Sequence, residues 1–168
     1  YEVIIFDKIK SKYLKKNQKQ IIGDILDTKL IENSVKNCDF VFHFAAMSNI
    51  EKSKIDPNQI INNNILGTQI LLDACKKYKI KRFIFSSTIY VYSDLGSFYR
   101  VSKQTCENLI EEYSKEYGLD YTILRFGSLY GPRADKNNSI RSFLSEAIEK
   151  KQIIRNSSGE ELREYIHV

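Results

Sequence analysis

The sequence is poor in residues that mark turn-rich or disulfide-linked folds. Its 168 residues include no Trp, 2 Pro, 7 Gly and 3 Cys. So little Gly and Pro is atypical of all-β or low-complexity chains. The cysteines are widely spaced and odd in number, which favours free thiols in a reducing compartment; they are Cys38, Cys75 and Cys106. No apolar run approaches the roughly 18 residues of a membrane span. We therefore expect a cytoplasmic protein with no membrane partner.

Charge gives no sign of a nucleic-acid partner. The chain carries 26 Lys and Arg against 21 Asp and Glu, a net charge of +5. Many lysines are interleaved with acids, as in the stretch from Glu111 to Glu116. Such patterns are typical of solvated helix faces. A hydrophobic fraction of 42% is sufficient for a packed core, so we expect one folded domain.

Short buried strands alternate with amphipathic helices along the chain. Apolar runs suited to strands buried on both faces occupy residues 3–6, 40–44, 83–85 and 121–124. Helical periodicity covers residues 27–35, 58–78, 99–117 and 139–150, with Gly118 as a C-terminal cap. The longest stripe is Ile61, Ile65, Leu66, Ile70, Leu71 and Ala74. We therefore predict an α/β fold, a Rossmann-like doubly wound parallel sheet with a truncated first strand and the start of a substrate-binding region.

The two ends of the sequence suggest a fragment. The chain opens on a strand without Met and stops within a pattern at Ile166-His167-Val168. We expect residues 1–168 to be one dinucleotide-binding domain that is incomplete at both ends. Loops are expected at Asn137-Asn138 and Ser157-Ser158-Gly159.

Acidic residues follow the first strands, where ligands of parallel α/β sheets bind. Asp7 ends the first strand and is suited to accept hydrogen bonds from both hydroxyls of an adenosine ribose, which favours NAD. A turn or helix cap is the alternative role. Asp24 and Ile25 are candidates for holding the adenine, although a glycine turn leading to a cap at Asp27 explains them equally simply. His43 is interpreted as structural.

The strongest catalytic candidates are Tyr99 and Lys103, which share one helix face. A neighbouring ammonium favours the phenolate, which could act as general base on a sugar hydroxyl. This spacing is common by chance. Ser86-Ser87-Thr88 strengthens it, because a hydroxyl at that strand end can share a proton with Tyr99.

The chain resembles the NAD-dependent epimerase/dehydratase family of extended short-chain dehydrogenases/reductases, most of all its nucleotide-sugar 4-epimerases. The matching stretches, in chain order, are residues 3–7, 23–25, 43–46, 63–68, 83–88, 91–92, 99–103, 124–127, 129–133 and 163–168. The resemblance implies NAD as cofactor, a nucleotide-sugar substrate, polysaccharide biosynthesis as the pathway and a homodimer when the protein is full length. No metal is implied.

The resemblance also implies roles for individual residues. The catalytic set is Thr88, Tyr99 and Lys103. The cofactor-binding set is Asp7, Asp24, Ile25, Phe44, Ala45, Ala46, Asn64, Ser86, Tyr99, Lys103 and Phe126. The substrate-binding set is Thr88, Ser128 and Arg133, where Arg133 suits a phosphate or is simply a surface arginine.

Four departures from the family pattern limit this inference. The glycine loop that cradles the pyrophosphate is missing. Only six residues, 93–98, separate Tyr92 from Tyr99, fewer than is usual for a loop that helps to shape the sugar pocket, so the resemblance does not define the substrate. Ile89 and Tyr90 stand where 4,6-dehydratases have an Asp-Glu pair, which argues against water elimination. Ser128 replaces a frequent Asn.

The leading hypothesis is therefore an NAD-dependent 4-epimerase that passes through a 4-keto sugar. A nucleotide-sugar reductase or dehydrogenase is the alternative, followed by a 4,6-dehydratase. A non-catalytic NAD-binding protein is disfavoured because Thr88, Tyr99 and Lys103 are all present.

Overall fold

The structure is a computed structural model that describes residues 1–134, 138–154, 158–160 and 162–168. The expected loop positions Asn137 and Ser157 lie outside these ranges. The chain divides into two compact units, Tyr1–Arg125 and Phe126–Val168, and each is described by itself. Within the described ranges, no helix has the length and apolar character needed to cross a membrane.

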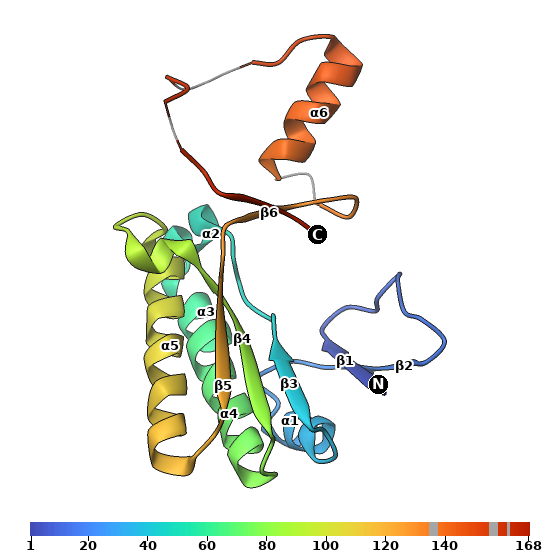
Figure 1. Cartoon of the computed structure of the whole chain (residues 1–168), viewed down its shortest axis with the longest axis vertical. Helices are drawn as coiled ribbons and strands as arrows, with labels where there is room; N and C mark the ends of the chain where they lie inside the picture. Colours follow the sequence, from blue (N-terminus) through green and yellow to red (C-terminus); the bar gives the residue numbers. More distant parts are fainter. Residues whose placement is uncertain (135–137, 155–157, 161) are drawn as a thin grey trace. The chain divides into compact units, whose positions relative to one another are not determined.

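Strands of the first unit form two sheets. Strand β4 (Arg82–Thr88) lies between β3 (Phe40–His43) and β5 (Tyr121–Phe126), and β3 runs parallel to β4 (Figure 1). Strands β1 (Val3–Asp7) and β2 (Gln18–Ile22) form a separate parallel pair. The predicted α/β class is confirmed. Within the described residues, β1 and β2 pair apart from β3, β4 and β5.

Helices cover the three-stranded sheet and enclose the core. Helix α1 (Thr28–Val35) begins after Asp27, whose side chain accepts a hydrogen bond from Leu30 N as an N-cap. Helices α4 (Gly67–Lys77) and α5 (Ser97–Tyr117) pack beside the sheet, and Gly118 ends α5 in the left-handed conformation at φ 69°. The residues that are most fully buried in the core are Phe83, Phe85, Leu72, Cys75, Cys106 and Ile110.

The long helix predicted over residues 58–78 is interrupted. The structure has α2 (Ile50–Ile55), α3 (Pro57–Ile60), a π-helical segment η1 (Ile61–Leu66), and then α4. A π turn is wider than an α turn, so the residues after it face different directions from those that an unbroken helix predicts. Ile61 and Leu66, predicted in the buried stripe, are therefore 46% and 41% exposed, whereas Asn64 is buried.

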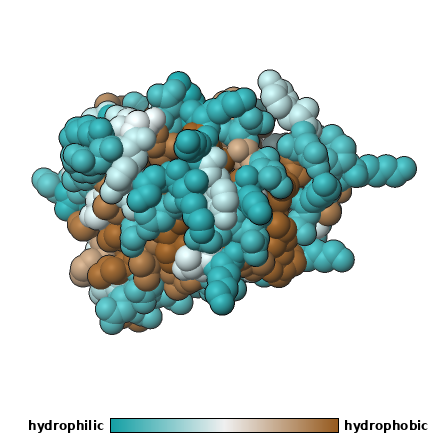
Figure 2. All heavy atoms as spheres, turned by 90° about the horizontal axis from the view of Figure 1, so that it is seen from below, coloured by the Kyte–Doolittle hydropathy of each residue, from teal (hydrophilic) through white to brown (hydrophobic). Residues whose placement is uncertain are grey.

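Several apolar side chains stay at the surface of the first unit. Among the described strands, β3 pairs with β4 alone, and Phe40 and Phe42 on it and Phe44 just after it are all exposed. Figure 2 shows brown hydrophobic patches among teal hydrophilic side chains on one face of the molecule. Edge strands are normally shielded because open backbone groups invite pairing with other chains.

Gly67 allows α4 to begin close to Ile25. A Cβ at this position would lie 2.8 Å from Ile25 Cγ2, which is too close for any side chain. We expect Gly67→Val to lower the free energy of unfolding by about 1–3 kcal/mol through overpacking. Urea denaturation measures the loss. Adding Ile25→Ala should recover part of it, and strictly additive losses in the double variant would contradict this contact.

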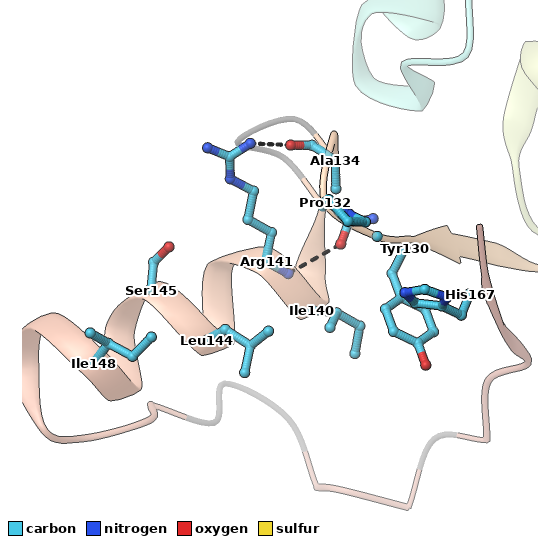
Figure 3. Close-up of a pocket in the computed structure, with 11 residues that line it drawn as sticks. Tyr130, Pro132, Ala134, Ile140, Arg141, Leu144, Ser145, Ile148 and His167 are labelled. Carbon is cyan, nitrogen blue, oxygen red and sulfur yellow. Dashed lines mark hydrogen bonds between the residues drawn. The ribbon is translucent and has the colours of Figure 1, made fainter.

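The second unit pairs β6 (Ser128–Tyr130) in parallel with β7 (Tyr165–His167) and adds helix α6 (Ser139–Lys150). Asn138 caps α6 by accepting a hydrogen bond from Arg141 N. Figure 3 shows residues of α6 and of the two strands lining a pocket. The volume of this pocket is about 490 Å³. Its wall includes Tyr130, Ile140, Leu144 and His167.

Candidate active site

The carboxyl end of β4 and the first turns of α5 bring the predicted catalytic residues together. Thr88 is the last residue of β4, and Tyr99 and Lys103 stand one turn apart on α5. Thr88 lies close enough to Tyr99 to lower the pKa of its phenol. The Lys103 Nζ lies 5.8 Å from the centre of the Tyr99 ring. A hydroxyl, a phenol and an ammonium thus form one cluster.

The local environment works against ionisation of Tyr99. Burial raises the pKa of the Tyr99 phenol above its usual value, and Thr88 acts in the opposite direction. Neighbouring Tyr90 raises this pKa slightly further. Additional positive charge beside Tyr99 is therefore needed before its phenolate can act as a base near neutral pH.

Lys103 is a buried cation with one fixed contact. Its Nζ donates to the Ser86 backbone oxygen at 2.7 Å and lies 4.6 Å from the centre of the Phe85 ring. Burial lowers the pKa of Lys103 to about 8, although Cys106 and Glu107 act to raise it. Because an ammonium has three N–H groups, two remain for a ligand after the Ser86 bond.

Asn64 is fully bonded within the protein. Its Oδ1 accepts from Met47 N at 2.8 Å, and its Nδ2 donates to the Met47 carbonyl at 3.0 Å and to Ser102 Oγ at 2.9 Å. Both amide hydrogens are used. Asn64 therefore ties the loop after β3 to α5, next to Tyr99 and Lys103. The expected direct contact with a cofactor stays a prediction.

His43 is buried beneath the cluster. Its Nε2 lies 2.9 Å from Thr68 Oγ1. Burial, with a smaller contribution from the Lys103 charge, lowers the pKa of His43 to about 3. The imidazole is therefore neutral near pH 7, which suits packing and a single hydrogen bond better than acid–base chemistry.

Asp7 and Asp24 lie at the ends of neighbouring strands. Gly23 N donates to the Asp7 backbone oxygen at 3.0 Å, which joins the two segments. The Asp7 carboxylate is exposed, and its Oδ1 accepts from Ile9 N at 2.9 Å. The Asp24 Oδ1 accepts from Leu26 N at 3.0 Å. The hydrogen bond from Leu26 and the ion pair with Lys8 lower the pKa of Asp24.

The remaining predicted cofactor residues differ in accessibility. Ile25 is buried in the core, so its side chain serves packing and only its backbone is available to an adenine. Phe44, Ala45 and Ala46 follow β3 and are exposed. Ser86 contributes its carbonyl to Lys103, as described above. Phe126 is the last residue of β5 and the first of the second unit.

The predicted substrate residues Ser128 and Arg133 both belong to the second unit. Ser128 opens β6, and its backbone N donates to the Glu164 carbonyl at 2.8 Å. Arg133 is exposed in the turn that follows β6. The resemblance-based roles of these two residues stay predictions.

The sequence interpretation missed an ion pair directly behind the cluster. Glu107 is buried, and Arg125 Nη2 donates to its Oε2 at 2.7 Å. Glu107 follows Lys103 by four residues on the same helix, so the helical repeat was a signal that could have revealed it. Arg125 could not be paired with Glu107 from the sequence. Among the described residues, no group of three or more His, Cys, Asp or Glu could hold a metal ion.

The donor set fits a dinucleotide cofactor. Asp7 offers an exposed carboxylate to ribose hydroxyls. Lys103 offers two further N–H donors, and its Nζ lies 5.8 Å from the centre of the Tyr99 ring. Exposed small side chains at Ala45 and Ala46 leave the backbone after β3 accessible to a flat ligand.

A Rossmann-like fold with Thr, Tyr and Lys gathered at a strand end is the arrangement of the extended short-chain dehydrogenases/reductases. The chain belongs to the NAD dependent epimerase/dehydratase family, which matches residues 1–168.

Relatives include both branches of this family. The chain is 31% identical over 172 residues to a dTDP-D-glucose 4,6-dehydratase of Dictyostelium discoideum, covering 87% of this chain and 40% of the relative. A UDP-glucose 4-epimerase from Thermotoga maritima aligns with a TM-score of 0.89 at 29% identity, covering 99% of this chain and 62% of that one. A dTDP-glucose 4,6-dehydratase from Streptomyces venezuelae with NAD bound aligns with a TM-score of 0.86 at 26% identity, covering 99% and 58%. The chain spans between 40% and 50% of the length of the first curated relatives, which are 4,6-dehydratases.

Proposed function

We propose that the full-length protein is an NAD-dependent nucleotide-sugar 4-epimerase. The observation that carries the proposal is the cluster of Thr88, Tyr99 and Lys103, in which a hydroxyl and a cation adjoin one phenol. Relatives at 25% identity or more that are epimerases or dehydratases of nucleotide sugars support the substrate class.

Each residue of the cluster has a distinct task. Tyr99, as phenolate, takes the proton of the sugar 4-hydroxyl, and Thr88 holds that hydroxyl by a hydrogen bond. Lys103 stabilises the phenolate and binds the nicotinamide ribose. Bound NAD would supply hydride transfer at sugar C4 and a positive charge that lowers the pKa of Tyr99.

The segment after Thr88 favours epimerisation over dehydration. Water elimination needs an acid and a base beside the sugar. The 3₁₀ turn η2 (Ile89–Tyr92) carries no carboxylate. Glu107 is the buried acid nearest in sequence to Lys103, and it is bonded to Arg125. A 4,6-dehydratase is the second candidate, because the first curated relatives have that activity.

Proton NMR of sugar products separates the candidates. The full-length protein would be incubated with NAD and, in turn, with UDP-, GDP- and dTDP-hexoses. We expect a new hexose signal at unchanged mass with no net reduction of cofactor. A 6-deoxy-4-keto product would establish the dehydratase instead. Lasting oxidation or reduction of the cofactor in step with product would establish a reductase or dehydrogenase.

Asp7 is proposed to select NAD through the adenosine ribose. We expect Asp7→Ala to weaken NAD binding about tenfold or more, because a charged acceptor of ribose hydroxyls is lost. Fluorescence titration measures the dissociation constant. Asp39→Ala is the control, since Asp39 is exposed and pairs with Lys81 at 2.7 Å. Equal NAD affinity in the Asp7 variant and the control would contradict this role.

We further propose a homodimer in which α4 and α5 pack against the same helices of a second copy, as the family resemblance implies. Val101 and Tyr117, which are 44% and 55% exposed on α5, supply apolar surface for such a contact. No nucleic-acid or membrane partner is proposed.

A further inference from the structure

A buried ionic cluster lies one helical turn beyond Lys103. The Glu107 side chain is only 8% exposed. Its Oε1 accepts from Ser87 Oγ at 2.5 Å and from Arg125 Nε at 3.1 Å, and its Oε2 accepts from Arg125 Nη2 at 2.7 Å. A carboxylate is retained at such depth only when it is paired and hydrogen-bonded, because losing its hydration is costly.

The Glu107–Arg125 ion pair contacts residues on both sides of Thr88 in the chain. Ser87 directly precedes Thr88 in β4, and Tyr92 closes the turn η2 that follows it. The Arg125 guanidinium donates to the Tyr92 hydroxyl through Nη1 and lies 4.8 Å from the centre of the Tyr92 ring. One ion pair therefore holds residues before and after Thr88.

Glu107 connects these contacts around Thr88 to helix α5, which carries Tyr99 and Lys103. Tyr99, Lys103 and Glu107 are spaced by four residues along α5 and so share one face. We propose that Glu107 is a positioning residue that, together with Arg125, holds Thr88 in register with Tyr99 and places a carboxylate one helical turn from Lys103. The expected effect on turnover rests on the proposed function, whereas the effect on the environment of Lys103 does not.

The second part of the proposal concerns charge. Lys103 is faced by Tyr99, Cys106 and Glu107 from α5 and by His43 from β3. Cys106 and His43 are buried groups whose pKa shifts favour their neutral forms. Glu107 thus supplies the carboxylate among these groups. Its removal should lower the Lys103 pKa further, because burial then acts with less opposition.

The test compares Glu107→Gln with Glu112→Gln in the full-length protein. Glu112 lies on the same helix but is 60% exposed and pairs with Lys115. We expect Glu107→Gln to lower kcat about tenfold or more with KM and NAD affinity little changed, as a misplaced catalytic group does. Glu112→Gln should match the wild type.

A readout that needs no turnover tests the charge directly. In ¹⁵N NMR of lysine Nζ groups, the Lys103 resonance is identified by its loss in Lys103→Met. We expect its titration midpoint to fall in Glu107→Gln and to stay in place in Glu112→Gln. Unchanged kcat together with an unchanged Lys103 midpoint in folded Glu107→Gln would overturn the proposal.

Tyr92→Phe keeps the test decisive if Glu107→Gln fails to fold. Tyr92 is 73% exposed, and Phe preserves its ring while removing the hydroxyl that Arg125 binds. We expect kcat to fall several-fold. A wild-type kcat would overturn the proposal that Arg125 positions Thr88 through Tyr92. If the wild-type protein turns over no nucleotide sugar, the proposed function fails, and the Lys103 midpoints still decide the role of Glu107.

Discussion

Replacing Tyr99 with Phe is expected to lower kcat of the full-length protein by about 10²–10⁴-fold, the usual contribution of a positioned acid–base group. The ring stays in place, so the packing around α5 is retained. Only the hydroxyl of the residue beside Thr88 is removed. Lys103 keeps its bond to the Ser86 carbonyl, so NAD affinity should change little. Steady-state kinetics and a fluorescence titration with NAD measure the two effects.

Tyr113→Phe is the matched control on the same helix. The Tyr113 hydroxyl donates to Asp73 Oδ1 at 2.8 Å, and burial together with this carboxylate raises the pKa of Tyr113 to about 12. Losing that bond should cost about 1 kcal/mol of unfolding free energy without touching turnover. The assignment of Tyr99 as the base would be wrong if the two variants kept equal activity.

Local signals in the sequence predicted much of the fold. Asp27 caps α1 and Gly118 ends α5, because both positions obey rules that depend only on neighbouring residues. Helix α6 spans Ser139–Lys150, the predicted range. The Tyr99–Lys103 pair was predictable for the same reason, since residues four apart on a helix share a face.

Features that depend on distant segments were not predictable. The π-helical segment η1 coincides with Asn64, which bonds to Met47 and Ser102, 17 and 38 residues away in the chain. Hydrophobic periodicity alone predicts an unbroken helix in that region and therefore predicts that Ile61 and Leu66 are buried. Likewise, nothing local links Glu107 to Arg125, because their pairing exists only once α5 packs beside β5.

The environment of Lys103 also predicts opposite effects on activity and stability. Lys103 as a whole residue is 3% exposed, and burial lowers its pKa to about 8, against an ordinary value of about 10.4. Keeping this group charged at pH 7 therefore destabilises the folded protein by about 3 kcal/mol, taking 1.36 kcal/mol per pKa unit. Lys103→Met should raise the unfolding free energy near pH 7, by up to that amount less the lost bond to Ser86. The same change should lower kcat by about 10²-fold or more, because the phenolate of Tyr99 loses its cation.

The pH dependence of this difference identifies its cause. Between about pH 8 and pH 10.4 the unfolded chain still binds the Lys103 proton and the folded protein does not, so wild-type stability rises with pH. The advantage of Lys103→Met should therefore shrink across that window, as denaturation with urea at each pH would show. Lys115→Met is the control, because Lys115 lies on the same helix at 63% exposure and should show no such trend. A constant difference between Lys103→Met and wild type from pH 7 to pH 10 would contradict the burial of a charged lysine. A stability difference that shrinks with rising pH would show that the charged Lys103 beside Tyr99 lowers the free energy of unfolding, as expected of a catalytic group.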